Sequence, residues 1–193
     1  MPPPMSENTQ KSRTPLFLTL IAAGVFIIGA AVIPLLVKGQ ETALNSAGIV
    51  RQPVVMNQAA PKLALTDLQG NPVSLGDTLG KVVLVNNWAT WCPPCKAEMP
   101  ELQAYYQAHA GQGFVVVAIE SGESAGTVSD FVRQLGMTFP VWLDPKGIAV
   151  EAFQNWGLPS SYVVDQRGTL RMSWTGEVNQ PTLEKYVTPL LEK

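Results

Sequence analysis

The chain has 193 residues, of which 46% are hydrophobic and 15% are charged, and its formal net charge is −2 at pH 7. A chain with this charge and no basic run lacks the positive surface that nucleic-acid binding needs, so we expect no nucleic-acid partner. Two cysteines and one histidine are too few for a disulfide-rich scaffold or for the usual four ligands of a structural zinc ion, and we predict no metal site.

The first sixty residues have the composition of a leader that precedes a folded domain. Residues 1–15 are polar and proline-rich, which predicts a disordered N-terminus. Residues 16–37 form an uncharged apolar run that spans about 33 Å as a helix, close to a bilayer core of roughly 30 Å. We interpret this run as a transmembrane anchor. A signal peptide is the alternative, although the run is long for one and no small-residue cleavage site follows it.

The charges beside this run predict its orientation. Lys11 and Arg13 precede the run, whereas Lys38 alone closely follows it. The excess of positive charge before the run places the N-terminus in the cytoplasm and the rest of the chain outside it, at the cell membrane. Residues 38–60 show no sustained periodicity, and we expect them to form a linker to a domain at 61–193.

The domain at 61–193 alternates between strand and helix patterns, which predicts an α/β fold with a mixed sheet covered by helices on both faces. Short apolar segments on either side of Gly70-Asn71-Pro72 predict an N-terminal hairpin. The segments that follow are predicted to be a strand at 81–88, a helix from 93 to about 109, a strand at 114–120, a helix at 124–136, a strand at 139–143, a helix at 148–157, paired strands at 161–165 and 169–176, and a last helix that includes 183–191.

Both cysteines lie where the strand at 81–88 gives way to a helix. A helix N-terminus carries about half a positive charge, which stabilises a thiolate, so Cys92 is predicted to be a nucleophile. Cys95 can then attack a mixed disulfide formed at Cys92, and Glu98 can accept or return a proton from the same helical face. Pro93 and Pro94 lack backbone N–H groups, which predicts a reducing couple, nearer thioredoxin at about −270 mV than DsbA at about −120 mV.

Three stretches together resemble the membrane-anchored TlpA/ResA-like thiol–disulfide oxidoreductases of the thioredoxin superfamily. The stretch "VNNWATWCPPCKAEMPEL" matches the pattern N-x-W-A-x-W-C-x-P-C-K-x-E-x-P. "FVVVAIESGES" and "VSDFVRQLGMTFPVWLD" resemble the strand–helix insertion of that branch, and "WGLPSSYVVDQRGTL" resembles its cis-proline strand and hairpin. The resemblance covers residues 60–193 and implies a thioredoxin-like fold with an N-terminal β-hairpin.

The resemblance also implies roles for single residues. Cys92 would be the nucleophile, Cys95 the resolving thiol and Glu98 the active-site glutamate. Leu158 and the expected cis-proline Pro159 would bind substrate.

Two further substrate contacts are expected beside Cys92. Pro93 follows the nucleophile and Trp91 precedes it. The sequence leaves open whether Trp91 lies in the core or forms part of an exposed apolar surface. Asn86 stands where thioredoxin has a buried aspartate, and Asn87 where an aromatic is usual, so a buried Asn87 amide would need hydrogen-bond partners.

The expected function is therefore the reduction of protein disulfides outside the cytoplasm through the Cys92–Cys95 dithiol, without an organic cofactor. The resemblance implies apocytochrome c as a substrate, in cytochrome c maturation, and a membrane electron donor of the CcdA/DsbD type. A copper-delivery module is an alternative, but His109 is the lone histidine and lies far from the cysteines. A peroxiredoxin-like peroxidase is another, but Thr90 lies two residues before Cys92, which does not fit T-x-x-C.

Overall fold

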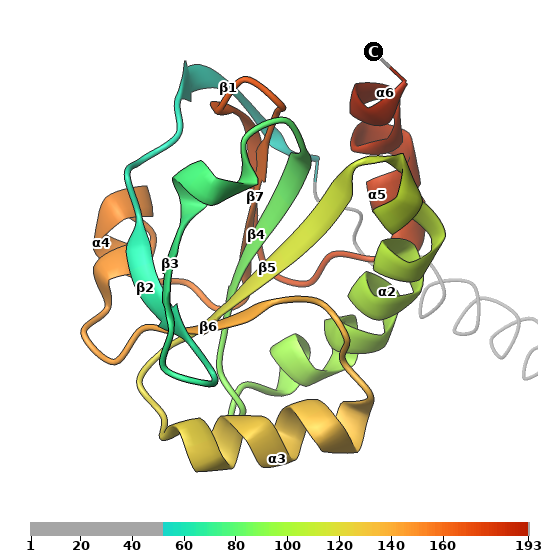
Figure 1. Ribbon diagram of the computed structural model, residues 1–193. Helices are drawn as coiled ribbons and strands as arrows, with labels where there is room; N and C mark the ends of the chain where they lie inside the picture. The colour runs from blue at the N-terminus through green and yellow to red at the C-terminus, as the bar shows by residue number, and fades with distance from the viewer. Residues whose placement is uncertain (1–51, 193) are drawn as a thin grey trace, which may run out of the picture. The chain divides into compact units, whose positions relative to one another are not determined.

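The computed structural model describes residues 52–192 (Figure 1). Within that range eight strands form one sheet, in the order β1-β8-β7-β4-β5-β6-β2-β3. The pairs β4–β5 and β5–β6 are parallel and the other pairs are antiparallel, which confirms the predicted mixed sheet. The strands are β1 (Val54–Ala59), β2 (Ala64–Asp67), β3 (Pro72–Ser74), β4 (Val82–Trp88), β5 (Phe114–Glu120), β6 (Val141–Leu143), β7 (Ser160–Val164) and β8 (Thr169–Thr175).

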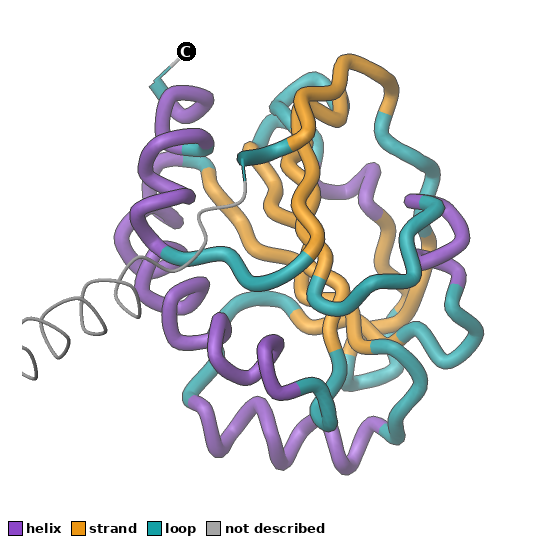
Figure 2. Tube along the Cα trace, turned by 180° about the vertical axis from the view of Figure 1, so that it is seen from behind, coloured by secondary structure: helices purple, strands orange, loops and turns teal. Residues whose placement is uncertain are grey.

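Helices cover both faces of this sheet, as expected. The α-helices are α2 (Pro93–His109), α3 (Ala125–Leu135), α4 (Ile148–Phe153), α5 (Gln180–Tyr186) and α6 (Thr188–Leu191), and the short 3-10 helices are η1 (Leu75–Thr78) and η2 (Ala110–Gln112). Helices α2, α3 and α5 pack on one face, where they bury Met99, Val128 and Leu183. Helix α4 packs on the other face through Ala149. Figures 1 and 2 show this uneven division, with most of the helical mass on one side.

Strand β4 lies between β5 and β7, and all seven of its residues are buried. Val82, Leu84 and Trp88 point into the core under α2, whereas Val83 and Val85 point into the core under α4. Burial on both faces explains why the strand has a continuous apolar run instead of an alternating pattern. The two asparagines of the strand, Asn86 and Asn87, are buried with it.

The predicted N-terminal hairpin is present as β2 and β3. The Asp67 carboxylate accepts hydrogen bonds from the backbone N–H groups of Gln69 and Asn71, and Gly70 has a φ of 83° that suits glycine. The predicted strand–helix insertion is also present. Helix α3 begins after Ser124, whose hydroxyl accepts from the Thr127 N–H, and ends at Gly136 in the left-handed conformation.

The structure differs from the sequence prediction at both ends of the domain. Residues 54–59, assigned to the linker at 38–60, form β1 on the edge of the sheet beside β8. Five of the six residues in β1 are exposed, so main-chain hydrogen bonds hold the strand in the sheet. Because most of its side chains pack against no core, the sequence shows no apolar alternation there.

The predicted last helix is divided into α5 and α6. Pro189 lies in the first turn of α6 and has no backbone N–H to continue α5, although the apolar residues keep a helical period across the break.

The predicted disordered N-terminus at 1–15, the apolar run at 16–37 and most of the predicted linker lie outside the described residues. Among residues 52–192, no helix is both long enough and apolar enough to cross a membrane.

Candidate active site

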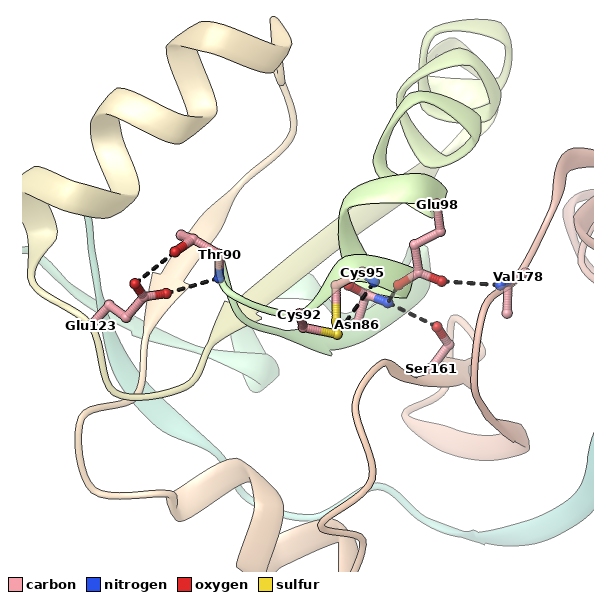
Figure 3. The surroundings of a disulfide bond; sticks show 8 residues. All are labelled: Asn86, Thr90, Cys92, Cys95, Glu98, Glu123, Ser161 and Val178. Carbon is pink, nitrogen blue, oxygen red and sulfur yellow. Dashed lines mark hydrogen bonds between the residues drawn. A yellow bond between two sulfur atoms is a disulfide. The ribbon is translucent and has the colours of Figure 1, made fainter.

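A disulfide joins Cys92 and Cys95 at the start of α2, directly after the loop that leaves β4 (Figure 3). Cys92 is the residue that caps the helix, and its Sγ accepts a hydrogen bond from the Cys95 backbone N–H at 3.3 Å. This confirms the predicted position of the pair at a strand–helix junction. Cys92 is 4% exposed and Cys95 is 0% exposed, so an incoming group meets the Cys92 sulfur first.

Pro93 and Pro94 occupy the first turn of α2, where a missing N–H costs the helix no hydrogen bond. Both prolines are exposed. The amide hydrogen bond to Cys92 Sγ therefore comes from Cys95, after the two prolines. This is the amide-poor spacer that the sequence predicts.

The peptide bond between Leu158 and Pro159 is cis, as the family resemblance implies. The antiparallel register pairs Asn87 with Ser160, so Pro159 enters β7 beside the end of β4 that leads to Cys92. Pro159 is buried, and Leu158 is partly buried against the core under α2. The topology thus brings the cis-proline segment and the cysteine loop to the same end of the sheet.

The sequence leaves open whether Trp91 is a core residue or part of an exposed apolar surface, and the structure decides between the two. The Trp91 side chain is 64% exposed, so it is a surface residue next to Cys92 and not a core residue. Trp88, three residues earlier on β4, is fully buried. The structure therefore places the predicted contact residues Trp91 and Pro93 on the surface beside the nucleophile.

Glu98 is fully buried one turn after Cys95, and its carboxyl group accepts two hydrogen bonds. Asn86 Nδ2 donates to Glu98 Oε1 at 2.8 Å, and the Val178 backbone N–H donates to Glu98 Oε2 at 3.0 Å. Asn86 Nδ2 also donates to Ser161 Oγ at 3.0 Å on the neighbouring strand β7. Figure 3 shows these residues gathered on one side of the disulfide.

Burial raises the pKa of Glu98 to about 8, although the hydrogen bonds from Asn86 and Val178 oppose the rise. Glu98 is therefore mainly protonated at neutral pH. Sequence reasoning identified Glu98 and the aspartate-to-asparagine change at Asn86, but it missed the contact between the two side chains. It also missed Ser161 and Val178, because neither belongs to a motif that carries acid–base chemistry.

A second acidic group lies on the other side of Cys92 and was not expected from the sequence. The Glu123 carboxylate accepts hydrogen bonds from the Thr90 backbone N–H at 2.8 Å and from Thr90 Oγ1 at 2.6 Å (Figure 3). Glu120 Oε2 accepts from the Glu123 backbone N–H at 3.0 Å. The sequence did contain one signal of this acidic group. Glu120 is a charged residue at the end of the otherwise apolar strand β5, and β5 ends beside the end of β4 that leads to Cys92.

Asn87 points into the opposite face of the sheet from Asn86 and is fully buried. Neither polar atom of its side chain has a hydrogen-bond partner among residues 52–192. The hydrogen-bond partners that a buried Asn87 amide needs are thus absent from the described part of the chain. Within the same range, no group of three or more His, Cys, Asp or Glu residues could hold a metal ion.

Comparison with known proteins gives consistent matches over the described domain. Residues 56–173 match the model of the AhpC/TSA family. The thiol-disulfide oxidoreductase ResA of Geobacillus kaustophilus is 33% identical over 134 residues, which cover 69% of this chain and 77% of the relative. ResA of Bacillus subtilis is 31% identical over 146 residues, covering 76% of this chain and 82% of the relative.

A solved structure from Chlorobium tepidum, described as a thiol:disulfide interchange protein DsbE, gives a similar result. It is 30% identical, has a TM-score of 0.66, and the match covers 70% of this chain and 97% of the other.

Replacing Glu98 should change how stability depends on pH. The folded-state pKa of about 8 lies above the ordinary 4.5, so the folded protein keeps a proton that the unfolded chain releases. The stabilising contribution of this group is complete below about pH 4.5 and is lost as the pH rises through about 8. Glu98→Gln stays neutral and should show a smaller fall in the free energy of unfolding than the wild type. Denaturant titrations of both proteins across this range test the difference, and equal slopes would contradict it.

The two neighbouring asparagines should respond in opposite directions to the same substitution. Asn87→Leu removes two buried polar atoms that lack partners and should raise the free energy of unfolding by about 1–3 kcal/mol. Asn86→Leu leaves the buried Glu98 Oε1 without its donor and should lower this free energy by a similar amount. Thermal and denaturant unfolding of both variants measure the effect. A loss of stability in Asn87→Leu as large as that in Asn86→Leu would refute the first expectation.

Proposed function

The chain belongs to the AhpC/TSA family and is a thiol–disulfide oxidoreductase, and on that premise we propose that it reduces protein disulfides outside the cytoplasm through Cys92 and Cys95. The observation that carries the proposal is the placement of the pair. Cys92 caps a helix beside the cis-proline segment, and Cys95 is buried behind it in the same turn.

The reaction begins with the reduced pair. The Cys92 thiolate attacks one sulfur of a substrate disulfide, that S–S bond breaks, and the departing sulfur takes up a proton. The Cys95 thiol then loses its proton and attacks Cys92 Sγ. This step releases the second substrate sulfur as a thiol and forms the Cys92–Cys95 disulfide seen in the structure. Two electrons pass from the enzyme to the substrate.

In this proposal the Cys95 proton passes to Glu98 in the fraction of molecules whose Glu98 carboxyl group is ionised. Its pKa of about 8 is close to the ordinary cysteine value of about 8.5, which permits proton exchange near neutral pH in either direction. Asn86 and the Val178 N–H hold the carboxyl group in place. Asn86 itself carries no exchangeable acid proton in this pH range, so Glu98 takes the role alone.

The reducing direction follows from how little the site stabilises a thiolate. Pro93 and Pro94 offer no amide donors to Cys92, and Glu98 adds negative charge nearby when it is ionised. A less stable thiolate raises the free energy of the reduced form, which makes the couple a stronger reductant.

The location and partners of the enzyme are the finer part of the proposal. The uncharged run at 16–37 supports a membrane anchor, with residues 61–193 on the far side of the membrane from the cytoplasm. There a membrane protein of the CcdA/DsbD type supplies electrons to the Cys92–Cys95 disulfide. Apocytochrome c, whose haem-attachment cysteines must stay reduced, is the proposed substrate.

Matched serine substitutions should separate the two cysteines. Cys92→Ser should reduce insulin disulfides, with dithiothreitol as the electron source, no faster than the background reaction. Cys95→Ser should also lose turnover, but after reduction and removal of dithiothreitol it should accumulate a mixed disulfide between Cys92 and the substrate, because no second thiol is present to resolve it. Non-reducing gels detect this adduct. Reductase activity that survives Cys92→Ser would refute the proposed nucleophile, and rapid peroxide consumption by the wild type would favour the peroxidase alternative.

The reduction potential tests the direction separately. Equilibration of the full chain in glutathione or dithiothreitol buffers should give a reduction potential nearer to about −270 mV than to about −120 mV. Replacing Pro93 and Pro94 together by alanine restores two amide donors and should shift the potential to a less negative value. A wild-type potential close to that of DsbA would overturn the reducing assignment while leaving the thiol–disulfide chemistry intact.

A further inference from the structure

We propose that Glu120 and Glu123 form a proton-dependent clamp on Thr90, which positions the segment that carries Cys92. The inference rests on the proposed function in one respect, namely that Cys92 is the nucleophile. Glu120 and Glu123 are positioning residues in this proposal, because they act on Cys92 through Thr90 and touch no reacting atom.

The clamp closes across the ends of two parallel strands. Main-chain pairing places Glu120 of β5 beside Trp88 of β4, and the Ser121 N–H donates to the Trp88 carbonyl at 3.0 Å. The chain then turns so that Glu123 reaches Thr90, two residues before Cys92. In Figure 3 this contact lies on the opposite side of the cysteines from Glu98. Two different carboxyl groups therefore flank the cysteines, and Glu123 is the one that bonds the Cys92 loop, through Thr90.

The two oxygens of Glu123 make two different bonds to Thr90, one from the backbone N–H and one from the hydroxyl. The bonds depend on a Glu123 carboxylate, because a charged acceptor forms stronger hydrogen bonds than a neutral one. Burial acts to raise the pKa of Glu123, but the Thr90 bonds, the interaction with Glu120 and the charge of Lys96 hold it below its ordinary value. Glu123 is thus ionised at neutral pH.

Glu120 is the group that loses its proton near neutral pH. Its side chain is fully buried, and Oε1 has no hydrogen-bond partner in the described part of the chain, which disfavours a charged carboxylate. Burial raises the pKa of Glu120 to about 7, opposed by the Glu123 N–H and assisted by the charges of Glu123 and Asp144. Glu120 is therefore close to half protonated at pH 7.

The charged groups around Glu120 and Glu123 determine how ionisation of Glu120 affects the bonds to Thr90. Asp144 follows β6, its backbone N–H donates to the Glu120 carbonyl, and its carboxylate accepts from the N–H groups of Ile148 and Ala149 at the start of α4. Lys96 of α2 acts on Glu123 and also lies over the Phe131 ring. Ionised Glu120 adds a third carboxylate beside Glu123 and Asp144, while Lys96 offers a single positive charge. Repulsion between Glu120 and Glu123 should then loosen the hold on Thr90.

The clamp predicts that the Cys92 segment is more tightly held below pH 7 than above it. The most direct observable is the backbone N–H of Thr90, because that group donates to Glu123. Amide hydrogen exchange by NMR on the oxidised full chain in detergent micelles should show the protection of Thr90 falling about tenfold as Glu120 ionises, after correction for the intrinsic pH dependence of exchange. A tenfold change corresponds to a coupling of about one pKa unit.

A neutral substitution isolates Glu120. Glu120→Gln cannot ionise, so the protection of Thr90 should stay constant across the same pH range. The matched control is Glu151→Gln, an exposed glutamate on α4, which should keep the wild-type fall. The same fall in Glu120→Gln as in the wild type would overturn the proposal. If Glu120→Gln does not fold, Glu123→Gln takes its place and should lower protection at every pH and remove the pH dependence.

Alkylation connects the clamp to the thiol. The rate at which iodoacetamide modifies Cys92 in the reduced Cys95→Ser chain, followed against pH, should lose one inflection near pH 7 when Glu120→Gln is added. An unchanged pH profile would show that the contact between Thr90 and Glu123 does not affect the reactivity of Cys92. Because exchange at Thr90 requires no reactivity at Cys92, a failed reductase assay and a failed clamp give different results.

Discussion

The parallel pairing of β4 with β5 and its antiparallel pairing with β7 bring three chain segments to one end of the sheet. These segments carry the cysteine loop, the Glu120–Glu123 turn and the cis Leu158–Pro159 bond. The burial of β4 on both faces fixes this arrangement, because a one-residue shift of register would move every side chain of the strand into the opposite core, which is packed around different residues. The position of Cys92 thus depends on the packing of β4, the strand that precedes it in the chain.

Two carboxyl groups of different kinds flank the cysteines. Glu98 is held by Asn86 and the Val178 N–H in the core under α2, and burial keeps it mainly neutral at neutral pH. Glu123 is ionised and holds Thr90 from the other side. The first group is suited to exchange a proton with a thiol, and the second to hold a loop. Both depend on how completely the surrounding side chains exclude water.

Much of the fold could be predicted from periodicity and from the residues that end each element. The runs at 82–88 and 114–120 have the apolar content of strands buried on both faces, and Gly136 ends α3 where the sequence indicates. Strand β1 could not be predicted, because an exposed edge strand is held by main-chain hydrogen bonds that any sequence can make. The break before α6 was missed because the apolar period continues across Pro189.

The sequence by itself determined the chemistry of the site. The spacing of Cys92 and Cys95 at a strand–helix junction, the two prolines between them and the proline at 159 are local features, and each acts through its own backbone or its near neighbours. Only the tertiary structure decided how protons are held around that pair. The contacts from Asn86 to Glu98, from Val178 to Glu98 and from Thr90 to Glu123 join residues 12 to 80 positions apart. A pKa depends on burial and on such distant neighbours, and neither is visible until the chain has folded.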